Sequence, residues 1–184
     1  AILFLLLASS VYLSTVGAKA ETDLLQQYIP IAEMRSLTLP DGTKVQLNSK
    51  STLLYPQEFT GDSRSVFLLG EANFKVKPDK KRPFIVKSND LQITALGTEF
   101  NVSAYPESQE IATTLISGSI RVDYNNLTTS VILHPNEQFA YNRNNKKYDP
   151  SNPAMDDVTA WQRGALVLHK MTLTDTINAL ERNY

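Results

Sequence analysis

Apolar and polar side chains alternate over short segments between residues 29 and 145, a pattern typical of half-buried β-strands. In the segment LPDGTKVQLN, Asp41 and Gly42 supply turn chemistry, and Val45 and Leu47 fall on one face of the strand that follows. Leu37 approaches the same turn from the other side. The pattern therefore predicts a β-hairpin at this position.

The same combination of a turn and a strand recurs along the chain. GEANFKV (70–76) and LGTEFNV (96–102) each place alternating apolar residues after a glycine, and weaker copies begin at Gly118 and Pro135. Units that recur about 18 to 28 residues apart predict a stacked β architecture. The expected fold class is all-β, a solenoid-like stack of short strands over residues 29–148.

The N-terminal segment has a different character. Residues 1–18 carry no charge, and as a helix they would span about 27 Å, close to the hydrocarbon thickness of a bilayer. We predict a transmembrane helix here and a linker over residues 19–28. The alternative is a secretory signal peptide, because Ala18-Lys19-Ala20 has the small-x-small form of a cleavage site. Both interpretations place the rest of the chain outside the cytoplasm.

The hydrophobic period changes again near the C-terminus, after a proline-containing linker predicted over residues 149–160. Residues 165–169 form a short apolar run typical of a strand, and Thr172 with Asp175 resembles a capping box. Apolar residues then follow at helical spacing, at Leu173, Ile177, Leu180 and Tyr184. One strand and one helix cannot form a core, so we expect residues 161–184 to begin a small α/β domain that is truncated here.

Composition excludes several classes of function. Eighteen basic and nineteen acidic side chains give a net charge of −1, so no strong positive field would attract nucleic acid. Without cysteine there is no disulfide or thiolate metal site. His134 and His169 lie in no metal-ligand spacing, and GxGxxG and GxSxG motifs are missing. We therefore expect that the protein is not an enzyme and that it has no cofactor, no metal, no small-molecule substrate and no nucleic acid partner.

One peptide bond suggests a single-turnover reaction. At Gly97-Thr98 a hydroxyl side chain follows a residue that tolerates strained backbone, which is the arrangement that an N-to-O acyl shift needs. The Thr98 oxygen would attack the Gly97 carbonyl, giving an ester that water can open. The alternative interpretation is a glycine turn followed by a β-branched strand residue.

Six segments in fixed order resemble the FecR family of sigma-factor regulators. They are LPDGTKVQLN, STLLYP, GEANFKV, PFIV, ALGTEFNVSAY and TTLISGSIRV. WQRGALVL and TLTDTINALERNY are similar to the start of the small C-terminal domain of the same family, especially of its Bacteroidetes branch, and this domain is STN-like. The resemblance covers most of the chain from residue 29 to residue 184.

Membership of this family implies an anti-sigma factor: a single-pass inner-membrane protein with its β domain in the periplasm. A cytoplasmic segment, expected before Ala1, would hold an extracytoplasmic-function (ECF) sigma factor. The signalling domain of an outer-membrane TonB-dependent transporter would contact the C-terminal part. Members of the family can be cleaved in the periplasm, and in some of them the first cleavage is spontaneous, at a Gly-Thr bond in the segment similar to ALGTEF. The resemblance therefore makes Gly97-Thr98 the candidate for self-cleavage.

We expect the partner contacts in the C-terminal segment, because a strand and an amphipathic helix there need neighbours. The predicted partner-binding residues are Trp161, Leu166, Leu168, Leu173, Ile177 and Leu180.

Two alternatives belong to other classes. One is a soluble periplasmic β-rich ligand-binding module, released by signal-peptide cleavage. The other is an accessory domain with exposed aromatic residues as a sugar platform. Phe74, Phe100 and Phe139 alternate with aliphatic residues, which places them in a core rather than on such a platform.

Overall fold

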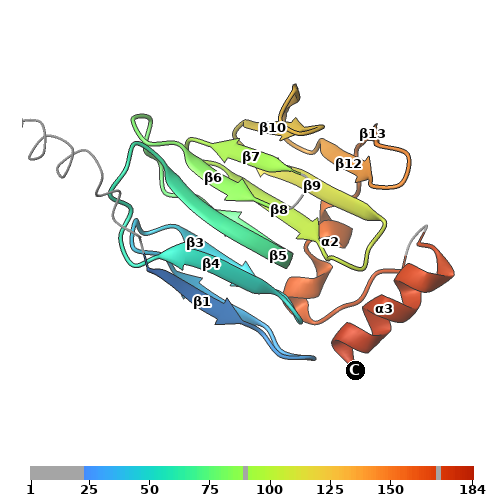
Figure 1. Ribbon diagram of the computed structural model, residues 1–184. Coiled ribbons are helices and arrows are strands. Elements are labelled where there is room, and N and C mark those ends of the chain that lie inside the picture. The colour runs from blue at the N-terminus through green and yellow to red at the C-terminus, as the bar shows by residue number, and fades with distance from the viewer. Residues whose placement is uncertain (1–22, 89–90, 169–170) are drawn as a thin grey trace, which may run out of the picture.

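The structure is a computed structural model that describes residues 23–88, 91–168 and 171–184, and most of it is β-sheet (Figure 1). The predicted transmembrane helix, residues 1–18, lies outside the described residues. Within the three described ranges, no helix has the length and apolar character needed to cross a membrane.

The described residues contain thirteen strands, which belong to one sheet. The strands are β1 (Leu24–Tyr28), β2 (Arg35–Thr38), β3 (Lys44–Leu47), β4 (Thr52–Pro56), β5 (Arg64–Lys75), β6 (Phe84–Lys87), β7 (Gln92–Ala95), β8 (Glu99–Ala104), β9 (Glu110–Ser117), β10 (Ile120–Tyr124), β11 (Thr129–Leu133), β12 (Gln138–Asn142) and β13 (Lys147–Ser151).

Strand β5 is the centre of the sheet. Its first half pairs with β4 and, in parallel, with β6, and its second half pairs with β3 and β8. From there the order runs outward through β7, β10 and β11 on one side and through β9, β12 and β13 on the other. The sheet curls into a half-barrel. The all-β prediction is confirmed, but the solenoid-like stack is wrong, because β8 returns to β5 instead of stacking on β7.

The hairpin predicted around Asp41 and Gly42 is present. Leu37 of β2 lies opposite Val45 of β3, and the Gly42 amide donates to the Leu39 carbonyl at 2.9 Å. The GEANFKV segment, in contrast, is not a separate unit after a turn. It is the second half of β5, and the strand runs through Gly70 without a reversal.

The core is formed by the inward faces of the strands. Phe74 stacks on Phe100 with ring centroids 5.4 Å apart, and Phe139 stacks on Tyr148 at 4.6 Å. Phe74, Phe100 and Phe139 are fully buried. Their predicted place in the core is confirmed, and they form no exposed sugar platform.

Both predicted linkers contain regular structure. The described part of linker 19–28 includes β1, which pairs antiparallel with β4. Linker 149–160 begins with the end of β13 and continues into helix α2 (Met155–Val158). Both strands bond through their backbones to a single neighbouring strand and expose most of their side chains, so their sequences lack the alternation typical of half-buried strands.

The C-terminal segment, predicted over residues 161–184, contains helical structure and no strand within its described residues. A 3₁₀ turn, η1 (Ala160–Arg163), follows α2, and helix α3 spans Leu173–Asn183. Residues 165–168, which the apolar run predicted as a strand, pair with no neighbouring strand. The described residues therefore do not support an STN-like α/β domain. Thr172 caps α3, as predicted, with its hydroxyl accepting from the Asp175 amide at 3.1 Å.

Candidate partner-binding surface

Trp161 attaches the C-terminal segment to the outward face of the sheet. Its indole N–H donates to the Asn101 side-chain oxygen at 3.3 Å, and the residue is only 8% exposed. Asn101 points away from the core because its neighbours in β8, Phe100 and Val102, point into it. Gly164 ends η1 in the left-handed conformation and turns the chain away after Trp161.

Glu71 lies beside this contact, on the outward face of β5. Its carboxylate accepts hydrogen bonds from the side-chain amides of Asn48 at 2.8 Å and Asn101 at 3.0 Å. A cavity of about 350 Å³ joins Glu71, Trp161 and Arg182. Burial raises the pKa of Glu71, and the two amides and the Arg182 charge oppose this rise in part. We call this contact region between the C-terminal segment and the β domain, which includes Glu71, Asn101, Trp161 and Arg182, the junction. The junction thus contains an acid, Glu71, whose charged form is disfavoured.

Helix α3 is attached to the β domain mainly through Arg182. The guanidinium lies over the Tyr105 ring, 3.8 Å from its centroid, and pairs with the Glu107 carboxylate at 3.0 Å. The Arg182 carbonyl also accepts from the Ala32 amide at 2.9 Å. Ala179, one turn earlier, is buried against the β domain. One side of α3 is therefore packed against the sheet.

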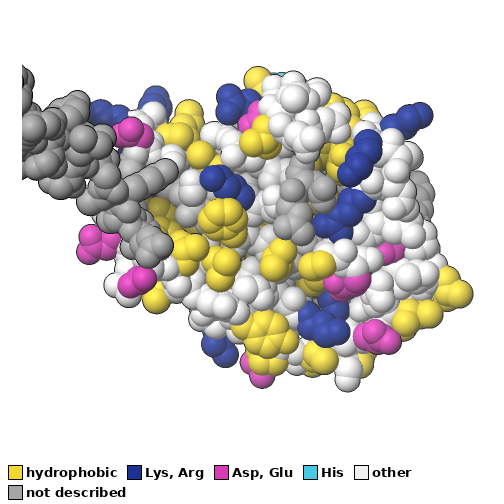
Figure 2. Space-filling view, viewed as in Figure 1, with side chains coloured by type: hydrophobic (Ala, Val, Ile, Leu, Met, Phe, Trp, Pro, Cys, Tyr) yellow, Lys and Arg dark blue, Asp and Glu magenta, His cyan; other side chains and the backbone are white. Residues whose placement is uncertain are grey.

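The opposite side of α3 is apolar and exposed. The exposed fractions are 77% for Leu173, 47% for Ile177, 41% for Leu180 and 88% for Tyr184. These four residues form the α3 stripe. Figure 2 shows hydrophobic side chains along the outer side of the helix, at the lower right. A helix with one buried and one exposed apolar side is typical of a surface that docks into a partner's groove.

The six predicted partner-binding residues therefore fall into two groups. Leu173, Ile177 and Leu180 share the α3 stripe, and Leu168 is also exposed. Leu166 is half-buried, and Trp161 is buried in the junction, where its ring is not available to a partner.

Sequence reasoning missed Arg182 and Glu71. Alternation in β5 assigns Glu71 to the solvent side, and the C-terminal segment that helps to cover it follows about ninety residues later. No local signal could reveal that contact. Arg182 carried one weak signal, a basic residue in the last turn of a helix.

The Gly97-Thr98 bond lies at a strained and crowded position. Gly97 has φ +150°, and a Cβ there would come within 2.9 Å of the Pro78 backbone. Thr98 is 7% exposed, and among the described residues its hydroxyl has no hydrogen-bond partner. The flanking backbone is held by bonds from Val76 to the Thr98 carbonyl and from Asp79 to the Leu96 carbonyl. A buried, unpartnered hydroxyl thus adjoins a backbone conformation that only glycine adopts readily.

The described residues contain no candidate metal site. Among the residues that the structure describes, no group of three or more histidine, aspartate or glutamate side chains could hold a metal ion.

The sequence profile described as "FecR protein" matches residues 29–121, half of the chain. This chain belongs to the FecR family. Two crystal structures of a "putative anti-sigma factor" from Parabacteroides distasonis ATCC 8503, at 2.50 and 1.65 Å resolution, are similar to it. Both are 37% identical in sequence, with TM-scores of 0.84 and 0.83.

These alignments extend over most of both proteins. They cover 88% and 87% of this FecR-family chain and 75% and 74% of the two structures. No curated protein matches the chain. The family and these neighbours support a regulatory role of the anti-sigma type and a protein that is not an enzyme.

Proposed function

We propose that this chain is the periplasmic part of a single-pass inner-membrane anti-sigma factor. The FecR profile match and the anti-sigma neighbours support the regulatory role. The uncharged run of residues 1–18 supports the membrane location. An ECF sigma factor would be held by a cytoplasmic segment before Ala1. Carbonate extraction should leave the protein in the membrane pellet; release of a soluble chain that begins near Glu21 would favour the signal-peptide alternative.

The signal would come from the signalling domain of an outer-membrane TonB-dependent transporter, which docks on the α3 stripe. The observation that carries this assignment is the geometry of α3: Arg182 fixes one side of the helix to the β domain, and the other side presents apolar residues to solvent. A rigidly held apolar face loses little conformational entropy when it binds a partner.

Calorimetric titration of the purified signalling domain tests this assignment. Ile177→Asp and Leu180→Asp should each weaken binding by about tenfold or more, because each places a charge in an apolar interface. Thr174→Asp adds the same charge to an exposed site beside the stripe and should leave the affinity nearly unchanged. Equal affinities for all three variants would assign the contact to another surface.

A second candidate function is self-cleavage at Gly97-Thr98, which the strained glycine and the unpartnered Thr98 hydroxyl support. The Thr98 oxygen attacks the Gly97 carbonyl carbon, the C–N bond breaks, and the nitrogen takes the hydroxyl proton. Water then hydrolyses the ester, leaving a carboxylate on Gly97 and a free amine on Thr98. Strands on both sides of the bond share one core, so the fragments should stay associated.

Mass spectrometry of protease-free protein tests the reaction. The wild type should yield a fragment that begins at Thr98, and Thr98→Ser should yield the corresponding one. Thr98→Val keeps the methyl group that packs on Gly118 and removes only the hydroxyl, so this variant should fold and stay intact. An intact wild-type chain after long incubation would contradict self-cleavage.

A further inference from the structure

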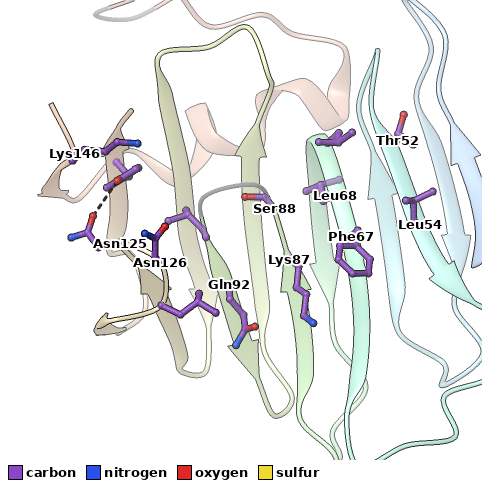
Figure 3. Close-up of a pocket in the computed structure, with 14 residues that line it drawn as sticks. Thr52, Leu54, Phe67, Leu68, Lys87, Ser88, Gln92, Asn125, Asn126 and Lys146 are labelled. Carbon is purple, nitrogen blue, oxygen red and sulfur yellow. Dashed lines mark hydrogen bonds between the residues drawn. The ribbon is translucent and has the colours of Figure 1, made fainter. Parts of the chain in front are cut away.

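The outward face of the sheet carries an apolar area where β1, β4 and β5 pair. Leu54 on β4 lies directly opposite Phe67 on β5 (Figure 3), and Leu69 is the next outward residue of the same strand. On the edge strand β1, Leu24 and Tyr28 belong to the same face, because their partners in β4 alternate with residues that pack in the core. We call these five residues the sheet patch.

Most of the sheet patch is exposed. The exposed fractions are 47% for Leu24, 51% for Tyr28, 41% for Phe67 and 40% for Leu69, and Leu54 is half-buried. Figure 2 shows hydrophobic side chains gathered over these strands, near the middle of the view. The solvent face of an antiparallel sheet usually carries polar side chains, so an apolar area of this kind is typical of a contact surface.

Charged groups of both signs lie at the rim of the sheet patch. The Lys87 ammonium lies 5.5 Å from the centroid of the Phe67 ring. The hollow beside Tyr28 is lined by charged residues of both signs, Lys50, Glu107 and Glu181. The rim therefore has no field of one sign that would recruit a charged partner, and the apolar side chains themselves must provide the attraction.

The place of the sheet patch in the chain indicates what it contacts. The predicted membrane anchor ends at residue 18, and Leu24, at one corner of the patch, follows six residues later. Six residues reach at most about 20 Å when they are fully extended. A tether this short holds the patch beside the bilayer at a high effective concentration, so even a modest apolar contact with lipid would form there.

We propose that the sheet patch docks the β domain onto the surface of the lipid bilayer. Leu54, Phe67 and Leu69 would enter the boundary between the headgroups and the acyl chains. Tyr28 would lie at the level of the headgroups, where tyrosine is enriched in membrane proteins. The inference rests on the proposed anchor and goes beyond the proposed relay, because it fixes the orientation of the β domain on the membrane.

Lipid quenching of the full chain in phosphatidylcholine nanodiscs, one copy in each disc, tests the docking. Because the sequence has no cysteine, Thr52→Cys places a single fluorescent label between Tyr28 and Leu69. Lipids that carry a doxyl group should quench this label, and the quenching should persist at high salt, because salt does not screen apolar contacts. Ser151→Cys labels an exposed site on β13, far from β1 in the strand order, and this label should stay unquenched.

A substitution within the sheet patch separates docking from mere nearness to the membrane. Phe67→Ser should lower the ratio of docked to free β domain by about fivefold or more, because it removes the largest apolar side chain of the patch. The ring is partly exposed, so the variant should stay folded, which circular dichroism checks. Ile132→Ser removes an exposed apolar side chain from β11 and should leave the quenching unchanged.

Two readouts keep the anchor and the docking apart. Retention of the chain with the nanodiscs during size exclusion reports on the anchor, and quenching of the Thr52→Cys label reports on the docking. The docking is overturned if a retained chain shows no quenching, equal quenching at both label sites, or equal quenching in the Phe67→Ser variant. A chain that is not retained overturns the anchor and the docking together. Shielding of the label only in discs with two copies would assign the sheet patch to a second copy of the chain instead.

Discussion

At the scale of single residues, Arg64 is a buried charge that several contacts hold in place. It is 1% exposed and pairs with the Asp41 carboxylate at 2.7 Å. It also donates to the carbonyls of Lys77 and Arg82, and it lies over the Phe84 ring. These bonds attach the β2–β3 turn to the charged loop before β6. The sequence did indicate that Arg64 is buried, because alternation in β5 places it on the same face as the core residues that follow.

Asp41→Ala should therefore destabilise the fold strongly. It leaves the Arg64 guanidinium buried without its anion, a change that costs about 3 to 5 kcal/mol in comparable sites. Urea unfolding should show a lower midpoint with an unchanged slope. Asp62→Ala, at an exposed position in the same region, is the control. A loss below about 1 kcal/mol for Asp41→Ala would mean that water reaches the guanidinium.

Glu71 should make stability depend on pH. Its folded-state pKa lies above its usual value near 4.5, so the folded protein holds this proton more tightly than the unfolded chain does. The contribution of Glu71 to the free energy of unfolding is thus greatest below pH 4.5 and is lost as pH rises from there through the raised pKa. Glu71→Gln should reduce this loss, measured as Tm against pH. Glu110, whose pKa burial also raises, should maintain a smaller slope in the variant.

Glu58→Gln is the matched control for Glu71→Gln, because Glu58 is exposed. If the two variants show the same dependence of Tm on pH as the wild type, Glu71 is hydrated in solution.

At the scale of elements, the sequence predicts strands that are buried on one face and misses those at the edges. Val45 and Leu47 identify β3 because alternation and a turn coincide there. Strand β13 escaped detection because Pro150 and the polar residues around it have the composition of a linker, although the backbone still pairs with β12. Residues 165–168 show the opposite error, since an apolar run forms a strand only where a neighbouring strand offers bonds.

Gly70 lies where β5 passes from its pairing with β4 and β6 to its pairing with β3 and β8. Gly70→Ala tests whether this passage needs a glycine. The residue has φ +107°, and a Cβ would come within 2.7 Å of the Ser51 Cα. Backbone strain and the clash together should cost about 2 to 4 kcal/mol. Gly61→Ala is the control, because nothing lies within 4 Å of a Cβ there and its effect should be small. Equal unfolding midpoints for the two variants would show that Ser51 can move aside.

At the scale of the whole molecule, the β domain and the C-terminal segment are stabilised by different amounts of contact. The sheet encloses one continuous core, whereas the junction depends on Trp161, Ala179 and Arg182 and on a few polar groups. The amphipathic α3 stripe could be predicted from helical spacing alone. Its attachment could not, because Tyr105 and Glu107 lie far from Arg182 in the sequence and meet it only in the folded chain.

The junction should therefore open before the β domain unfolds. Trp161 is the chain's single tryptophan, so its fluorescence reports on the junction alone, while far-ultraviolet circular dichroism reports on the sheet. In urea, the shift of tryptophan emission should precede the loss of the β signal. Arg182→Ala should lower the fluorescence midpoint and leave the circular dichroism midpoint in place. Leu173→Ala, on the exposed side of α3, should move neither. Coincident transitions in the wild type would show that the junction and the sheet unfold as one cooperative unit. A partner on the α3 stripe would then act on the whole domain rather than on a separable segment.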